Sequence, residues 1–230
     1  MQIILDLMRY YSFKINEMKK INPEFIWLFC CSCFCVALSF YRIYFTQKTF
    51  FIFLNWNLLL ACVPLIVSSL LVSNPFLFKS KIAFALSLMV WVLFFPNSPY
   101  IFTDLFHIKV RTIIPIWYDL VLILSFAFTG LMMGFVSLRQ LLKVAAQYFS
   151  QTFINVCVVL LFFISSYGIY LGRFLRWNSW DIINEPAQLI HDMGNHVTNP
   201  AENASIWAMT VIMGIFLNMI YWSYKVIKLS

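Results

Sequence analysis

Six long apolar stretches separated by short polar segments constrain this chain more than any other feature. They lie at residues 25–44, 50–72, 81–95, 116–138, 153–171 and 204–224. A helix needs about 20 apolar residues to cross the hydrocarbon core of a bilayer, and only the third stretch falls clearly short of this length. Charged residues make up 11% of the chain, against roughly 25% in soluble domains. The sequence therefore predicts an all-α fold: a polytopic transmembrane helical bundle of about six spans, in one integral membrane domain over residues 1–230.

The polar segment PNSPYIFTDLFHI, residues 96–108, follows the short third stretch directly. Pro96 ends that span, because proline removes a backbone donor and disfavours helix in the residue before it. A short helix over residues 100–108 would place Tyr100, Thr103, Asp104 and His107 on one face. Its other face would carry Ile101, Leu105 and Ile108. We expect such a segment to lie in the membrane interface or to dip back into the protein.

A second polar segment, YLGRFLRWNSWD at residues 170–181, follows the fifth span. Two spans separate the two segments, so both leave the membrane on the same face. Beyond the second segment, Ile182, Leu189, Ile190 and Met193 recur at helical spacing and predict an interfacial amphipathic piece. The fold thus includes short interfacial helices on one face. His191 and His196 follow there without a predicted role.

These two segments supply the candidate site. The candidate catalytic residues are Asp104, His107 and Asp119, and the candidate binding residues are Asn97, Tyr100, Thr103, Arg173, Arg176, Trp177, Asn178 and Asp181. A carboxylate near the bilayer is costly and suggests function, but Asp104 equally suits a helix cap or a solvated interface group. Asp119 would need a partner such as Arg173. Asp104 and His107 have the spacing to share a metal, yet a lone histidine near a helix end is usually a hydrogen-bonding group, so we predict neither a metal site nor a cofactor.

The distribution of charge predicts the orientation. Lysine and arginine are more frequent in the first 20 residues and in the connections after the second, fourth and sixth spans than in the other connections, which favours both termini in the cytoplasm of a cell-membrane protein. The first 20 residues lack a small-residue cleavage site and suit a helix on the inner membrane surface. The net charge of +7 then indicates contact with membrane lipids and no nucleic-acid partner.

Two spans carry Gly-x-x-x-Gly, at Gly130 with Gly134 and at Gly168 with Gly172. Small residues allow close helix contact in lipid, so we expect these two spans to pack tightly, either on each other or on a homo-oligomer or protein partner. All six cysteines lie in spans, where cysteine acts as a small apolar residue.

The segments PNSPYIFTDLFHI, WYDL at residues 117–120 and GRFLRWNSWD at residues 172–181 resemble the bacterial integral-membrane family called domain of unknown function 1361. The resemblance covers most of the chain, from about residue 81 to residue 181. It implies a small polytopic bacterial membrane protein and supplies no activity.

Three functions remain open from the residues. The first is a site at the extracytoplasmic face that binds or processes an amphiphile with a polar or anionic head group. The second is a non-catalytic membrane subunit or scaffold, in which an Asp–Arg network only fixes the bundle. A small transporter ranks lower, because the central parts of the spans carry almost no charge.

Overall fold

The computed structural model describes residues 23–74, 80–108 and 114–229, and over these ranges it contains helices and no strands. The helices are α2 (Pro23–Thr46), α3 (Phe53–Ser73), α5 (Lys81–Phe94), α6 (Asn97–Tyr100), the 3₁₀ helix η1 (Ile101–His107), α7 (Ile116–Ala145), α8 (Gln151–Phe174), α9 (Asp181–Asn184), α10 (Pro186–Thr198) and α11 (Ala204–Leu229). Within these described ranges six segments are long and apolar enough to cross a membrane, which confirms the predicted helical bundle. The predicted surface helix in the first 20 residues lies outside the described residues.

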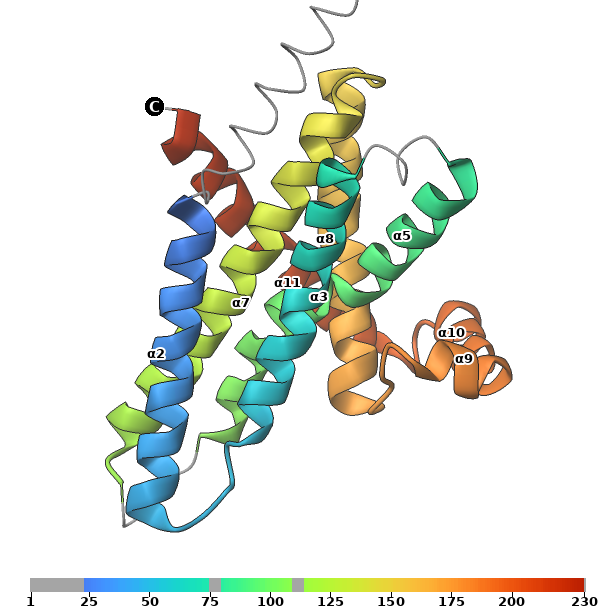
Figure 1. Cartoon of the computed structure of the whole chain (residues 1–230). Coiled ribbons are helices and arrows are strands. Elements are labelled where there is room, and N and C mark those ends of the chain that lie inside the picture. The colour runs from blue at the N-terminus through green and yellow to red at the C-terminus, as the bar shows by residue number, and fades with distance from the viewer. Residues whose placement is uncertain (1–22, 75–79, 109–113, 230) are drawn as a thin grey trace, which may run out of the picture.

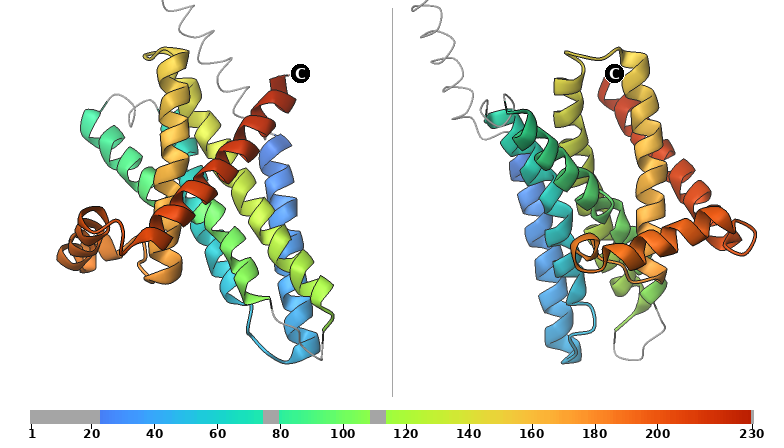
Figure 2. Two further views of the ribbon diagram at one scale, coloured as in Figure 1. Left: turned by 180° about the vertical axis from the view of Figure 1, so that it is seen from behind. Right: turned by 90° about the vertical axis from the view of Figure 1, so that its right-hand side faces the viewer.

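Successive spans run in opposite directions, so each end of the bundle collects one end of every span (Figure 1). At one end α2 and α8 finish, α3 and α7 begin, and η1 closes the third span; we call this the polar end. The opposite end holds the start of α2 and the end of α11 (Figure 2). There Arg139 of α7 pairs with Glu24 of α2 and also donates to the hydroxyl of Tyr224 at 3.3 Å. Both ends of the described chain therefore lie on the same side of the bundle.

The third span is longer than predicted, because the polar segment belongs to it. The candidate span runs from Lys81 to His107, through α5, α6 and η1, whereas the sequence predicted a span over residues 81–95 and a separate interfacial helix. Pro96 and Pro99 interrupt the α-helical ladder, and tighter bonds, such as Ser98 N–H to the Phe95 carbonyl at 3.1 Å, keep the chain turning. Ser98, Pro99, Ile101, Thr103 and Asp104 are buried. The segment thus dips into the protein.

The predicted two-faced α-helix over residues 100–108 is wrong in its register. Residues 101–107 form a 3₁₀ helix, in which side chains three apart line up. Ile101, Asp104 and His107 therefore share a line along η1, although the α-helical spacing placed Ile101 opposite Asp104. Both Ile101 and Asp104 are fully buried.

The glycines of both Gly-x-x-x-Gly motifs pack against this broken helix, and not against each other. A Cβ atom added at Gly130 or Gly134 of α7 would lie 2.9 Å from the Ile101 side chain or 2.8 Å from the Ser98 Cβ. On α8, a Cβ at Gly168 would meet Pro96 at 3.2 Å and a Cβ at Gly172 would meet the Tyr100 ring at 3.3 Å. Small residues permit close approach of helices, and here they allow the third span to pack closely against both α7 and α8. An oligomer or protein partner on these spans stays a prediction, and it would have to contact surfaces beside the glycines.

Helix α7 lies between two apolar clusters. One cluster joins it to α2, α3 and η1, around residues such as Leu54, Leu122 and Phe126. The other joins it to α5, α8 and α11, around Phe135 and Phe162. This central position explains why α7 is the most buried span.

Helices α9 and α10 project sideways from the bundle near the polar end (Figure 2). Ile183, Ile190 and Val197 recur on their outer surface and are largely exposed. Proline at the start of α10 suits the first helical turn, where its missing N–H costs nothing. The two helices match the predicted amphipathic piece after the second polar segment.

Candidate functional site

The two polar segments contact each other at the polar end. Asn97 donates through its side-chain amide to the hydroxyl of Ser179 at 3.2 Å. Each side chain also donates a hydrogen bond to a carbonyl of the helix that Pro96 interrupts. Asn97 donates to the Phe94 carbonyl at 3.0 Å, and Ser179 donates to the Leu93 carbonyl at 3.2 Å. These contacts join stretches of chain that lie 82 residues apart.

Asp104 is the centre of the site. One of its carboxylate oxygens accepts from Nη1 of Arg173 on α8 at 2.9 Å, and the other accepts from the side-chain amide of Asn57 on α3 at 2.9 Å. The carboxylate is fully buried. Burial penalises its charge, and the guanidinium and the amide offset that penalty. Three spans are therefore joined through this one carboxylate.

Arg173 differs from Asp104 in its access to the surface. Its side chain keeps 11% of its area exposed, against 1% for Asp104. A guanidinium carries five N–H donors, and among the described residues one hydrogen bond, to Asp104, is formed. The guanidinium also lies 5.7 Å from the centre of the Phe106 ring.

Asp119 pairs with Arg42 of α2, and the predicted pairing with Arg173 is wrong. Nε and Nη2 of Arg42 donate to the two carboxylate oxygens at 2.7 and 3.1 Å. Only 2% and 3% of the two side chains are exposed. The Arg42 guanidinium also stacks over the Phe51 ring, 4.3 Å from its centre. Helix packing decides the partner, since α2 contacts α7 directly and Arg173 is held at Asp104.

His107, Thr103 and Tyr100 lie beside the site and contribute less directly. The His107 ring packs edge-on against the Phe53 ring, with 5.3 Å between the ring centres. This contact is one between two aromatic rings. Thr103 donates to the carbonyl of Tyr100 at 2.7 Å, within its own turn. No group of three or more potential metal ligands occurs in the part of the chain that the structure describes.

The remaining candidates terminate α8. Arg176 is exposed and has a left-handed backbone with φ of 61°, which turns the chain out of the helix. The indole of Trp177 donates to Asp192 of α10 at 3.1 Å, and Asn178 donates to the Asp181 carboxylate through its backbone N–H at 2.6 Å. These residues fix the α8–α10 connection and do not contact Asp104.

His196 has a partner that the sequence did not suggest. It is buried, and its Nδ1 lies 2.8 Å from the hydroxyl of Tyr167 on α8. The carbonyl of His196 also accepts from the indole of Trp207 on α11 at 3.1 Å. His191, one turn earlier on the same helix, is exposed. Of the two histidines, His196 anchors α10 to the bundle.

Comparison with protein families matches residues 56–220 to the model described as Protein of unknown function (DUF1361). The chain belongs to this family. Comparison with curated proteins and with solved structures gives no match.

Two site residues of this DUF1361 member were missed by the sequence reasoning. Arg42 stands near the end of the first predicted span, and an arginine inside an apolar run signals a buried partner. Asn57 stands early in a largely apolar span, and an amide there needs hydrogen bonds within the protein. Both signals were present, but neither identifies the acid that is contacted.

The two ion pairs differ in what they can do chemically. In the Arg42–Asp119 pair both carboxylate oxygens accept a hydrogen bond from the arginine, and the pair is sealed from solvent by burial of both side chains. In Arg173–Asp104 both carboxylate oxygens are also taken, so Asp104 is not a free base, but the guanidinium has donors left and reaches the surface. Arginine suits phosphate and carboxylate groups because its planar fork donates in pairs. The geometry of this DUF1361 member thus favours binding over proton transfer.

Proposed function

We propose that this member of the family is a multi-pass protein of a bacterial cell membrane whose polar end faces away from the cytoplasm. Lysine and arginine are more frequent in the first 20 residues and the segments of the opposite end, taken together, than in the connections of the polar end, which supports this orientation. The termini would then both lie in the cytoplasm.

The polar end would bind the polar or anionic head group of a membrane amphiphile, with Arg173 as the principal donor. The observation that carries this proposal is the contrast between the two arginines: Arg42 is buried and bidentate, whereas Arg173 is monodentate and partly exposed. Asp104, which is itself fixed by the amide of Asn57, holds the guanidinium in place, and this reduces the entropy lost on binding. Arg176, exposed three residues further along where the chain leaves α8, adds a second cation near the same end of the bundle.

Thermal unfolding of the purified protein in maltoside micelles tests the head-group site. The probes are dioctanoyl phosphatidylglycerol and dioctanoylglycerol, which share their acyl chains and differ in the head group. We expect the phosphate-bearing probe to raise the midpoint of unfolding more, because ligands that bind only the folded state stabilise it. Arg173→Gln should abolish this difference, and Lys48→Gln, which removes an exposed cation of the connection between α2 and α3, should keep it. Equal responses of the wild-type protein to the two probes would contradict the head-group site.

A non-catalytic scaffold is the second candidate, and the sealed Arg42–Asp119 pair favours it. In that case the polar end serves only to join spans, and Arg173→Gln lowers the stability of the protein while the wild-type protein does not distinguish the two probes. The double variant Asp104→Asn with Arg173→Gln removes both charges, and it separates the loss of stability from the loss of binding. It should recover most of the lost stability for either function. For the binding site, the response to the phosphate-bearing probe should still be absent from this stable double variant.

A further inference from the structure

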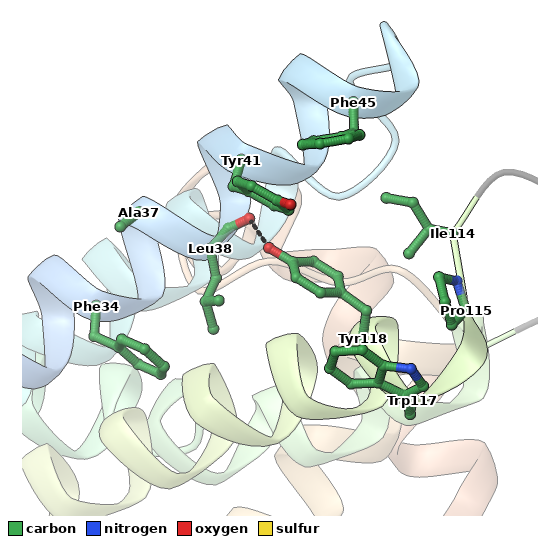
Figure 3. A pocket seen from close by; sticks show the side chains of 9 residues that line it. All are labelled: Phe34, Ala37, Leu38, Tyr41, Phe45, Ile114, Pro115, Trp117 and Tyr118. Carbon is green, nitrogen blue, oxygen red and sulfur yellow. Dashed lines mark hydrogen bonds between the residues drawn. The ribbon is translucent and has the colours of Figure 1, made fainter.

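An apolar groove runs between α2 and the start of α7, away from Asp104 and Arg173 (Figure 3). Its volume is about 590 Å³, within the usual range of ligand sites. Side chains of α2 and of the first turn of α7 form its walls, chiefly Phe34, Leu38, Tyr41, Phe45, Trp117 and Tyr118.

The groove opens toward lipid. Both helices are candidate membrane spans, and Phe34 and Trp117 on its rim are 54% and 61% exposed. The Tyr118 hydroxyl between its walls is already bonded to the Leu38 carbonyl at 2.8 Å (Figure 3). Water would find few partners there, so hydrocarbon is the natural occupant.

The length of the groove matches one leaflet of a bilayer. From Phe34 to Phe45 the helix rises 1.5 Å per residue, which gives about 17 Å. Half of the hydrocarbon core is about 15 Å. The groove ends at the polar end of the bundle, where Tyr41, Trp117 and Tyr118 place amphipathic rings of the type that line membrane interfaces.

The spacing of the two walls is fixed before any ligand arrives. The Arg42–Asp119 pair ties α2 to α7 directly beside Tyr41 and Tyr118, the preceding residue in each helix. Tyr41 in turn packs against Phe45 and Tyr118, at 4.6 and 5.7 Å between ring centres. A groove with fixed walls binds without the cost of ordering them.

Aromatic walls favour a flexible chain over another helix. Helices associate in membranes through small residues that let their backbones approach. Here the rim is built from phenylalanine, tyrosine and tryptophan, and Ala37 is the one small residue in the lining. We propose that this groove binds one acyl chain of a phospholipid from the leaflet at the polar end. The proposal does not depend on the head-group site at Arg173.

Photolabelling of the full chain in vesicles of phosphatidylethanolamine and phosphatidylglycerol tests the groove. A trace phospholipid carries a diazirine midway along one acyl chain, and the labelled peptides are mapped by mass spectrometry. We expect labelling of residues 34–45 and 114–118 to saturate and to be competed by unlabelled phospholipid, whereas labelling of other lipid-facing helices rises in proportion to the probe. Proportional labelling of the groove would overturn the proposal.

A matched pair of variants provides the second measurement. Ala37→Trp fills the groove, and Ala85→Trp adds the same bulk to the exposed surface of α5. We expect groove labelling to fall about tenfold in the first variant, equivalent to about 1.4 kcal/mol, and to stay unchanged in the second. Equal labelling of the groove in the two variants would contradict a specific chain site, and the saturation experiment on the unmodified protein decides the question should Ala37→Trp not fold.

Discussion

The Arg42–Asp119 pair offers the sharpest test of how this bundle is held together. Asp119→Asn keeps the size of the side chain and removes its charge, leaving a guanidinium that is 2% exposed without its counter-ion. Removing one partner of a buried pair typically costs about 3–5 kcal/mol, and the near-complete burial leaves little relief by solvent. For a chain of this size 1 kcal/mol shifts the unfolding midpoint by roughly 2–4 °C, so we expect a fall on the order of 10 °C. Titration with sodium dodecyl sulfate in mixed micelles measures the same loss as free energy.

Two further variants test whether the loss of stability comes from the unpaired buried charge. Arg42→Met combined with Asp119→Leu replaces both charges by apolar side chains, and such exchanges are often neutral or stabilising, so stability should return close to the wild-type value. Glu24→Gln is the control, since its pair with Arg139 is partly exposed and worth about 1 kcal/mol or less. A double variant as unstable as Asp119→Asn, or a single variant no worse than Glu24→Gln, would refute the assignment of this pair as a buried clamp.

Three other outcomes follow from the structure. Asp104→Asn should cost less than Asp119→Asn, about 1–2 kcal/mol in the same titration, because its partner guanidinium can turn toward the surface. Gly134→Ala should cost about 1–3 kcal/mol, because the added methyl group would stand 2.8 Å from a buried serine, whereas Gly194→Ala, with nothing within 4 Å, should be neutral; equal costs would contradict the packing. Cysteines at the exposed positions of Phe106 and Asn178 should react with a membrane-impermeant maleimide from the same side of intact cells or vesicles, and labelling from opposite sides would exclude a shared polar end.

The spans were predictable because the apolar length of a membrane helix is a local property of the sequence. Five of the six predicted stretches fall on single helices, and the third was recognisably short. Its continuation was not predictable in detail, since the choice of a 3₁₀ helix over residues 101–107 depends on burial against α7 and α3. That choice brings Ile101 onto the same line as Asp104, while His107 stays on it. That the two polar segments lie at the same end of the bundle could be predicted from the number of spans between them.

The partners of the acids could not be read from the sequence. Asp104 and Asp119 each need a cation, and several arginines lie near the same membrane face. The observed pairs join residues 69 and 77 positions apart, and the pairing follows from which helices touch. A polar residue in an apolar run, such as Asn57, shows that some contact exists, whereas its identity is a property of the packed bundle.

The break in the third span explains why the two polar segments belong together. The α-helical ladder of α5 ends before Pro96, and the carbonyls of a last helical turn at membrane depth need other donors, because each unsatisfied group there is costly. Asn97 and Ser179 donate to two of the carbonyls in that last turn, and the glycines of α7 and α8 let the broken segment approach closely enough to be enclosed. The asparagine and the serine are thus accounted for by backbone chemistry alone, which leaves the partly exposed guanidinium of Arg173 as the polar group of this region that the stability of the fold does not fully explain.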